Sequence, residues 1–188
     1  HRLAIGFTAQ VSVSSCRAAA AADSQGRRGL LLQPHMLISP RHFLEFCGPA
    51  YRQITDLARS IDADVVVVDT DGNIDQLIPL LDQLGVNGLY PAECKAGNDL
   101  FALRRQFPEF IFFGWLEKET VNENNEDRIE EEILSKVPRL IRSGRYFPNL
   151  DHSLQPLCTY RNLCRFMTCL HRAVGSPLGR FPRIAAAS

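Results

Sequence analysis

The sequence predicts an α/β fold in which parallel strands alternate with helices. The first observation is VVVV at residues 65–68, an uninterrupted apolar run typical of a strand that is buried on both faces. The second is FIFFGW at residues 110–115, a further run of the same kind. The third is that amphipathic segments of helical length separate such runs, which favours a parallel sheet with right-handed crossovers.

A helix is expected before the first strand, from residue 39 to about residue 61. Ser39 is a favoured N-cap residue, and Pro40 suits the first helical position. Its predicted inward side chains are Phe43, Phe46, Ile54, Leu57 and Ala58. The strand VVVVD follows, and Asn73 is expected to cap the next helix.

The rest of the chain repeats the order of strand and helix three times. The expected strands are residues 86–90, 110–115 and 145–150, and the expected helices are residues 98–107, 126–142 and 159–173. Asn98 is predicted to cap the first of these helices, and Pro138 to bend the second. Two architectures fit, an open doubly wound sheet or part of a (β/α)8 barrel. No GxGxxG follows the first strand, so a dinucleotide fold lacks its main signature.

Three regions are predicted along the chain. Residues 1–29 combine an Ala run, small polar residues and a basic pair without a sustained period, and are expected to be weakly ordered. Residues 30–175 are expected to form the folded domain. Residues 176–188 are expected to be a flexible tail, because this end of the chain is rich in Pro and Gly. Since the chain begins with His, it is expected to be a fragment or a processed product.

Composition narrows the classes of function. The 188 residues carry equal numbers of acidic and basic side chains, with a sequence pI of about 7.1, which gives no electrostatic case for a nucleic acid or an acidic membrane as partner. No apolar run approaches the ~20 residues that span a bilayer, and no secretory signal pattern is present. The six Cys lack CxxC spacing and predict reduced thiols in the cytoplasm.

Polar residues follow every predicted strand. They are Asp69 and Asp71 after the first strand, Tyr90 and Glu93 after the second, Lys118 after the third, and Asp151 and His152 after the fourth. In parallel α/β folds the loops after the strands converge at one rim, so these side chains are expected to lie together.

Structural roles compete with functional ones at several of these positions. Asp71 belongs to a DGN sequence that also suits a turn and a helix cap. Asp69 is harder to explain structurally, because a carboxylate that ends an apolar strand needs a partner or a shifted pKa. In the pair Asp151-His152, a carboxylate is expected to orient and charge the imidazole.

Three segments also carry a family resemblance. They are DTDGNIDQLIPLLDQLGVNGLYPAECKAGNDLFALRRQF, GWLEK and SGRYFPNLDHSLQP. The ordered set DGN, PAE-x-x-AG-x-D, G-x-x-x-K and DH resembles the uroporphyrinogen decarboxylase family. It is most similar to an uncharacterised decarboxylase-like branch of a superfamily that includes corrinoid-linked methyltransferases. The resemblance starts near Ile38 and ends at about Gly175.

The resemblance implies a partial (β/α)8 barrel of about four parallel strands, similar to the C-terminal half of the family's barrel. It implies carboxy-lyase chemistry in porphyrin biosynthesis, on a tetrapyrrole or a related carboxylate substrate and without a cofactor. The substrate-gripping Arg residues and the Asp of the N-terminal half are absent here. The predicted catalytic residues are Asp69, Asp71 and His152, of which His152 carries over by motif. The predicted substrate-binding residues are Glu93, Lys118, Asp151 and Tyr90.

The methyltransferase branch supplies the alternative enzyme, a corrinoid-linked methyltransferase or demethylase. In that branch the corresponding strand ends in His-x-Cys-Gly and binds zinc, whereas this chain has Asp69-Thr70-Asp71-Gly72. Hard oxygen ligands disfavour thiol activation on zinc, while a divalent metal held by Asp69 and Asp71, with Glu93 or His152, stays open.

A second class of function is not enzymatic. A half-barrel leaves strand edges and an inner face uncovered, and exposed edges favour pairing with another chain. One alternative is therefore a symmetric homodimer in which two copies close one barrel. The other is an inactive product of truncation.

Overall fold

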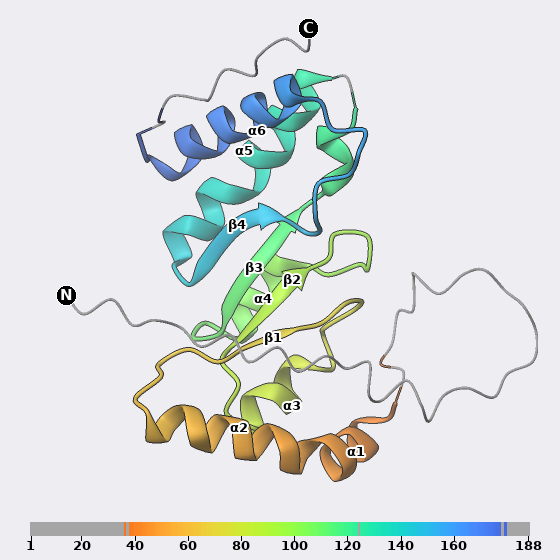
Figure 1. Ribbon diagram of the computed structural model, residues 1–188, viewed down its shortest axis with the longest axis vertical. Coiled ribbons are helices and arrows are strands. Elements are labelled where there is room, and N and C mark those ends of the chain that lie inside the picture. Colours follow the sequence, from red (N-terminus) through yellow and green to blue (C-terminus); the bar gives the residue numbers. More distant parts are fainter. Residues whose placement is uncertain (1–35, 37, 124, 178, 180–188) are drawn as a thin grey trace, which may run out of the picture.

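The structure, a computed structural model, describes residue 36 and residues 38–123, 125–177 and 179. The predictions for residues 1–29 and for most of residues 176–188 lie outside these ranges. The chain is α/β, with one four-stranded parallel sheet whose strands follow the order of the chain (Figure 1). The strands are β1 (Val67–Asp69), β2 (Gly88–Ala92), β3 (Ile111–Leu116) and β4 (Tyr146–Leu150).

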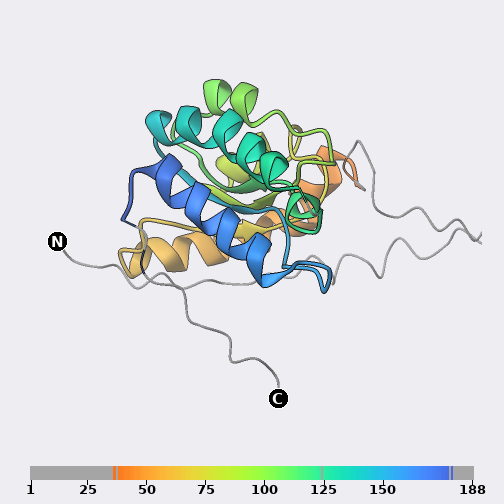
Figure 2. The same cartoon turned by 90° about the horizontal axis from the view of Figure 1, so that it is seen from above.

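The helices alternate with the strands as predicted. They are α1 (Pro40–His42), the π-helical turn η2 (Phe43–Cys47), α2 (Gly48–Ser60), α3 (Ile78–Gln83), α4 (Leu100–Gln106), the 3₁₀ turn η3 (Lys118–Val121), α5 (Glu126–Ser143) and α6 (Tyr160–Val174). Helices α3, α4 and α5 connect successive strands. Because parallel crossovers are right-handed and all run in one direction here, these three helices belong on one face of the sheet. Helices α2 and α6 lie at opposite ends of the molecule, beyond β1 and β4 (Figure 1), and Figure 2 gives the view along the axis that joins these ends.

The two faces of the sheet differ in burial. Val68, Leu89 and Phe112 follow one another across the strands and form part of the helix-covered core. On the other face Phe113 is paired with Phe147, whose side chain is 53% exposed, and the two rings stack with centroids 4.6 Å apart. The prediction of a strand buried on both faces is wrong for residues 65–68, since Val65 is exposed and Val66 and Val67 are only half-buried, whereas β3 is buried at every position except the half-buried Phe113.

Several helix boundaries differ from the prediction. Ser39 is the N-cap of α1 as expected, since its side chain accepts a hydrogen bond from the amide of His42. Asn73 is not a helix cap, because its side chain accepts the amide of Asp75 in a turn and α3 begins only at Ile78. At α4 the cap is Asp99, whose carboxylate accepts two amides of the first turn.

The outward face of α2 also departs from the prediction. Phe46 and Leu57 were expected to point inward, but they are 70% and 63% exposed. The helix instead packs through Gly48, Tyr51 and Thr55, and the Thr55 hydroxyl donates to the carbonyl of Leu84 at 2.8 Å. The apolar side chains of Phe46 on η2 and Leu57 on α2 are thus left uncovered by the described residues.

Helix α5 passes through Pro138 without ending and packs against α6. Its buried residues are Ile129, Ile133, Val137 and Leu140, spaced so that they share one face. Glu130 joins the two helices by ion pairs with Arg165 and Arg172. None of the helices in the described ranges has the length and apolar character needed to span a membrane.

Candidate functional site

The loops after β1, β2 and β4 bring three predicted site residues together. One potential ligand atom from each of Asp71, Glu93 and His152 lies within 4.8 Å of the other two. Asp71 is exposed, whereas Glu93 and His152 are half-buried. The residues are far apart in sequence, so it is the parallel sheet that places them at one rim, as expected from the strand ends.

Glu93 is the residue that holds this rim together. One of its carboxylate oxygens, Oε1, lies 2.5 Å from Nε2 of His152, and the other accepts the backbone amide of Gly72. The side chains of Glu93 and His152 are 17% and 28% exposed. Glu93 therefore fixes the imidazole and the DGN loop at the same time, a pairing that the sequence did not indicate.

Asp151 has a different role from the one expected beside His152. Its side chain is almost completely buried, and its two oxygens accept the backbone amides of Cys94 and Lys118, each at 3.0 Å. The carboxylate therefore ties together the loops after β2 and β3. It is Glu93, and not Asp151, that orients His152.

Asn98 is a positioning residue that sequence reasoning missed. It is buried, and its amide nitrogen donates to the carbonyls of Gly72 and Glu93 while its oxygen accepts the amide of Ile74. It thus holds the DGN loop against the loop that carries Glu93. One signal in the sequence was available: two polar residues, Asn98 and Asp99, stand side by side before the helix. Only one of them is needed as the N-cap, so the other can have a different role.

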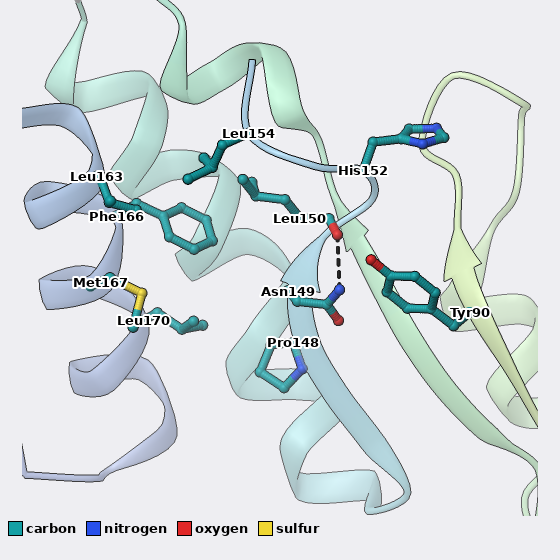
Figure 3. A pocket seen from close by; sticks show the side chains of 10 residues that line it. All are labelled: Tyr90, Pro148, Asn149, Leu150, His152, Leu154, Leu163, Phe166, Met167 and Leu170. Carbon is teal, nitrogen blue, oxygen red and sulfur yellow. Dashed lines mark hydrogen bonds between the residues drawn. The ribbon is translucent and has the colours of Figure 1, made fainter. Parts of the chain in front are cut away.

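Lys118 and Tyr90 lie at the margins of the site. Lys118 is the first residue of η3, and its backbone amide donates a hydrogen bond to the carboxylate of Asp151. The ion pairs beside it are made by Lys95, whose ammonium lies 3.3 Å from Glu117 and 3.0 Å from Glu119. Tyr90 shares a pocket with His152, and its hydroxyl points toward β4 (Figure 3).

Below the rim, Cys94 belongs to a half-buried polar cluster. The Lys136 ammonium donates to Glu132 at 2.5 Å and to the Trp115 carbonyl at 3.1 Å, and it lies 3.5 Å from the Cys94 sulfur. Burial raises the pKa of the Cys94 thiol far above its usual range, and the cation of Lys136 only partly offsets this. The thiol therefore stays protonated and is not a nucleophile.

Asp69, which ends β1, has a carboxyl group with a raised pKa. Burial and then the neighbouring charge of Asp71 raise the pKa of its carboxyl, while His152 acts in the opposite direction. A raised folded-state pKa gives stability that is present at low pH and is lost as the pH rises through that pKa. The ionised carboxylate therefore destabilises the fold at neutral pH.

Asp69→Asn is accordingly expected to stabilise the protein at neutral pH, by no more than about 1 kcal/mol because the side chain is exposed and solvent screens its charge. The gain should disappear as the pH falls toward the ordinary aspartate value of 3.8. Urea unfolding of wild type, Asp69→Asn and the exposed control Asp75→Asn across this pH range tests the expectation. A gain that is the same at every pH, or that Asp75→Asn reproduces, would contradict it.

Comparison with family models found no match to this chain, and comparison with curated proteins found none either.

Proposed function

We propose that the chain is part of a (β/α)8 barrel enzyme of the uroporphyrinogen decarboxylase type, a carboxy-lyase that transfers protons at the Glu93–His152 pair. The observation that carries this proposal is the 2.5 Å contact between Glu93 and His152 at the rim. The sequential strand order supports the barrel, because the strand order of a doubly wound sheet reverses at a switch point. The placement of α3, α4 and α5 on one face supports it too, since a doubly wound sheet carries helices on both faces. Cys94, Cys158, Cys164 and Cys169 form no disulfide, which supports a cytoplasmic location.

The pair suits the acid–base steps of decarboxylation. When a carboxylate leaves carbon as CO2, a proton must take its place on that carbon, and a positioned side chain supplies it. Glu93 engages Nε2 of His152, and Nδ1 lies on the other side of the imidazole ring. Nδ1 is therefore the atom available to hold or deliver the proton, while Glu93 fixes the orientation of the ring.

The charge at the rim narrows the substrate class. Asp69, Asp71 and Glu93 place three carboxyl groups around His152. Such a rim repels a substrate that carries many carboxylates near the reacting carbon. A tetrapyrrole or smaller molecule with a single carboxylate at that end fits the site better than a polyanion.

Release of labelled CO2 from carboxyl-labelled tetrapyrrole acetates tests the activity. The expected result is slow turnover by the wild-type chain, because the substrate-gripping Arg residues are absent, and a loss of that turnover by roughly a hundredfold or more in His152→Ala and in Glu93→Gln. The rim variant Asp75→Asn serves as the matched control and should keep wild-type turnover. Turnover that His152→Ala leaves unchanged, or no turnover by wild type, would argue against the proposal.

A second candidate function is divalent metal binding, favoured by the convergence of Asp71, Glu93 and His152. Two carboxylate oxygens and one imidazole nitrogen form a donor set that suits Mn²⁺ or Zn²⁺. Binding would replace the proton between Glu93 and His152, so affinity should rise with pH.

Calorimetric titration with Mn²⁺ and with Zn²⁺ separates the two candidates. The metal hypothesis predicts one site, release of protons, and a loss of affinity of roughly tenfold or more in Asp71→Asn and in His152→Ala but not in Asp75→Asn. Binding that is unaffected by Asp71→Asn would exclude this site. In that case the Glu93–His152 pair acts without a metal.

A further inference from the structure

Aromatic side chains lie side by side on the face of the sheet that α3, α4 and α5 do not cover. Phe113 on β3 and Phe147 on β4 are partners in register, and their rings stack with an interplanar angle of 10°. Tyr90 on β2 extends the series, since its ring meets that of Phe113 edge to face with centroids 6.4 Å apart. The three rings therefore form one continuous apolar surface over three neighbouring strands.

On the fourth strand the series ends in a carboxylate. Asp69 on β1 is the register partner of Tyr90. It follows Val68, which lies in the helix-covered core, so its side chain projects from the opposite face. Asp69 and the three rings form the aromatic row. Strands lie about 4.8 Å apart, so three such spacings give the row a length of about 14 Å.

The described part of the chain leaves the aromatic row open to solvent. Phe147 is 53% exposed although one face of its ring is stacked on Phe113, so the exposed area belongs to its other face and its edge. Tyr90 and Phe113 are half-buried, and Asp69 is exposed. Exposed aromatic surface that is continuous over several strands marks a site of contact with an apolar ligand, because covering it removes apolar area from water.

The negative charge at the Asp69 end of the row is not balanced. Neither Asp69 nor Asp71, in the loop that follows, forms an ion pair within the described ranges. Two basic side chains of the same rim are engaged elsewhere: Lys95 with two glutamates after β3, and His152 with Glu93. Carboxylates and the faces of aromatic rings both attract positive charge, and together they recognise organic cations.

We propose that the aromatic row binds an elongated organic amine, whose ammonium group lies against Asp69 and whose apolar body lies along the three rings. Charge complementarity selects the cation, because an anion of the same shape meets two uncompensated carboxylates. The length of the row selects a body that spans three strand spacings. Tyr90 also lines a pocket together with His152, so the row adjoins the Glu93–His152 pair (Figure 3). The inference concerns binding alone and goes beyond the proposed function.

Phenylhexylamine provides the probe, because its ring and extended chain are about as long as the row. Titrated calorimetrically into the full chain in the presence of EDTA, it should bind roughly fivefold more tightly than phenylhexanol, the effect of an exposed ion pair. Phenylhexanoate should bind more weakly than the alcohol, since the carboxylates repel it. Phenethylamine is too short to cover the row and should bind roughly tenfold or more weakly than phenylhexylamine.

Two serine substitutions test the apolar part of the row. Phe147 and Phe46 are both exposed, and Phe46 lies on η2, outside the row. Phe147→Ser should weaken binding of phenylhexylamine by roughly tenfold, the effect of losing most of one aromatic contact, while Phe46→Ser should not change it. Since both side chains are exposed, both variants should keep the fold.

Two further variants and an NMR measurement test the charged end. Asp69→Asn should remove most of the preference for the amine over the alcohol, whereas the exposed control Asp75→Asn should keep it. Intermolecular NOEs should join the phenyl protons of the probe to Phe147, and the methylene beside its nitrogen to Asp69.

Several outcomes would overturn the inference. Equal binding of amine, alcohol and carboxylate would show that the surface does not select charge. Equal effects of Phe147→Ser and Phe46→Ser, or NOEs outside the row, would place the amine elsewhere. No binding would exclude the site, and a dimer that Phe147→Ser dissociates would make a second copy the occupant of this face. None of these readouts measures CO2 release or metal binding, so failure of the proposed function and failure of this inference are distinguishable.

Discussion

Asp151→Ala is expected to lower the free energy of unfolding by about 3 kcal/mol, because it removes two charge-assisted hydrogen bonds and leaves two backbone amides without acceptors. The amides are those of Cys94 and Lys118, in two different loops. Urea denaturation monitored by Trp115 fluorescence measures the change. The effect should reach the functional site as well, since Glu93 lies next to Cys94 in the chain.

Two variants control for this prediction. Asp82→Ala changes an exposed aspartate on α3 and should cost less than about 0.5 kcal/mol. Asp151→Asn keeps the shape and one acceptor oxygen, so it should recover part of the lost stability. If Asp151→Ala destabilises no more than Asp82→Ala, the buried carboxylate does not hold the two loops together.

Arg104→Met is expected to be destabilising by a similar amount, about 3 kcal/mol. The Arg104 guanidinium is buried and donates to the carbonyls of Pro108, Phe110 and Arg145 at 2.9, 2.7 and 2.6 Å. It also lies 4.8 Å from the centre of the Phe112 ring. Methionine fills the space but leaves these buried carbonyls without donors.

The neighbouring residue offers a matched control for this substitution. Arg105 follows on the same helix and is exposed, so Arg105→Met should change stability by less than about 0.5 kcal/mol. Arg104→Lys should recover little, because a single ammonium cannot reach both the loop after α4 and the start of β4. Calorimetric melting of the three variants distinguishes these cases. If Arg104→Lys is as stable as the wild type, the planar guanidinium with its two donor nitrogens is not needed at this position.

Local patterns predicted most of the fold. Apolar runs located β3 and β4 to within one residue at each end, and Ser39 and the Thr159 region located the starts of two helices. The wrong predictions of helix boundaries arose where tertiary contacts override the local pattern. Asn73 looked like a cap, but Asn98 and Glu93 hold the DGN loop in a turn, so α3 starts later.

The site was predictable as a set of residues and not as a set of pairs. Strand ends indicated that Asp71, Glu93 and His152 would share a rim, because parallel strands deliver their loops to one side of a sheet. Adjacency in sequence suggested Asp151 as the partner of His152. Neighbouring residues at a strand end point in opposite directions, so Asp151 turned into the core while His152 turned toward Glu93.

Pro148 has a consequence for how the open edge of β4 behaves toward other chains. It lies in the middle of the open edge of β4, and proline has no N–H to donate. Fibrils of the cross-β type grow by repeating every backbone hydrogen bond from one strand to the next. An edge interrupted at its centre is a poor template for unlimited growth, so the same residue that weakens this edge protects the chain from aggregation.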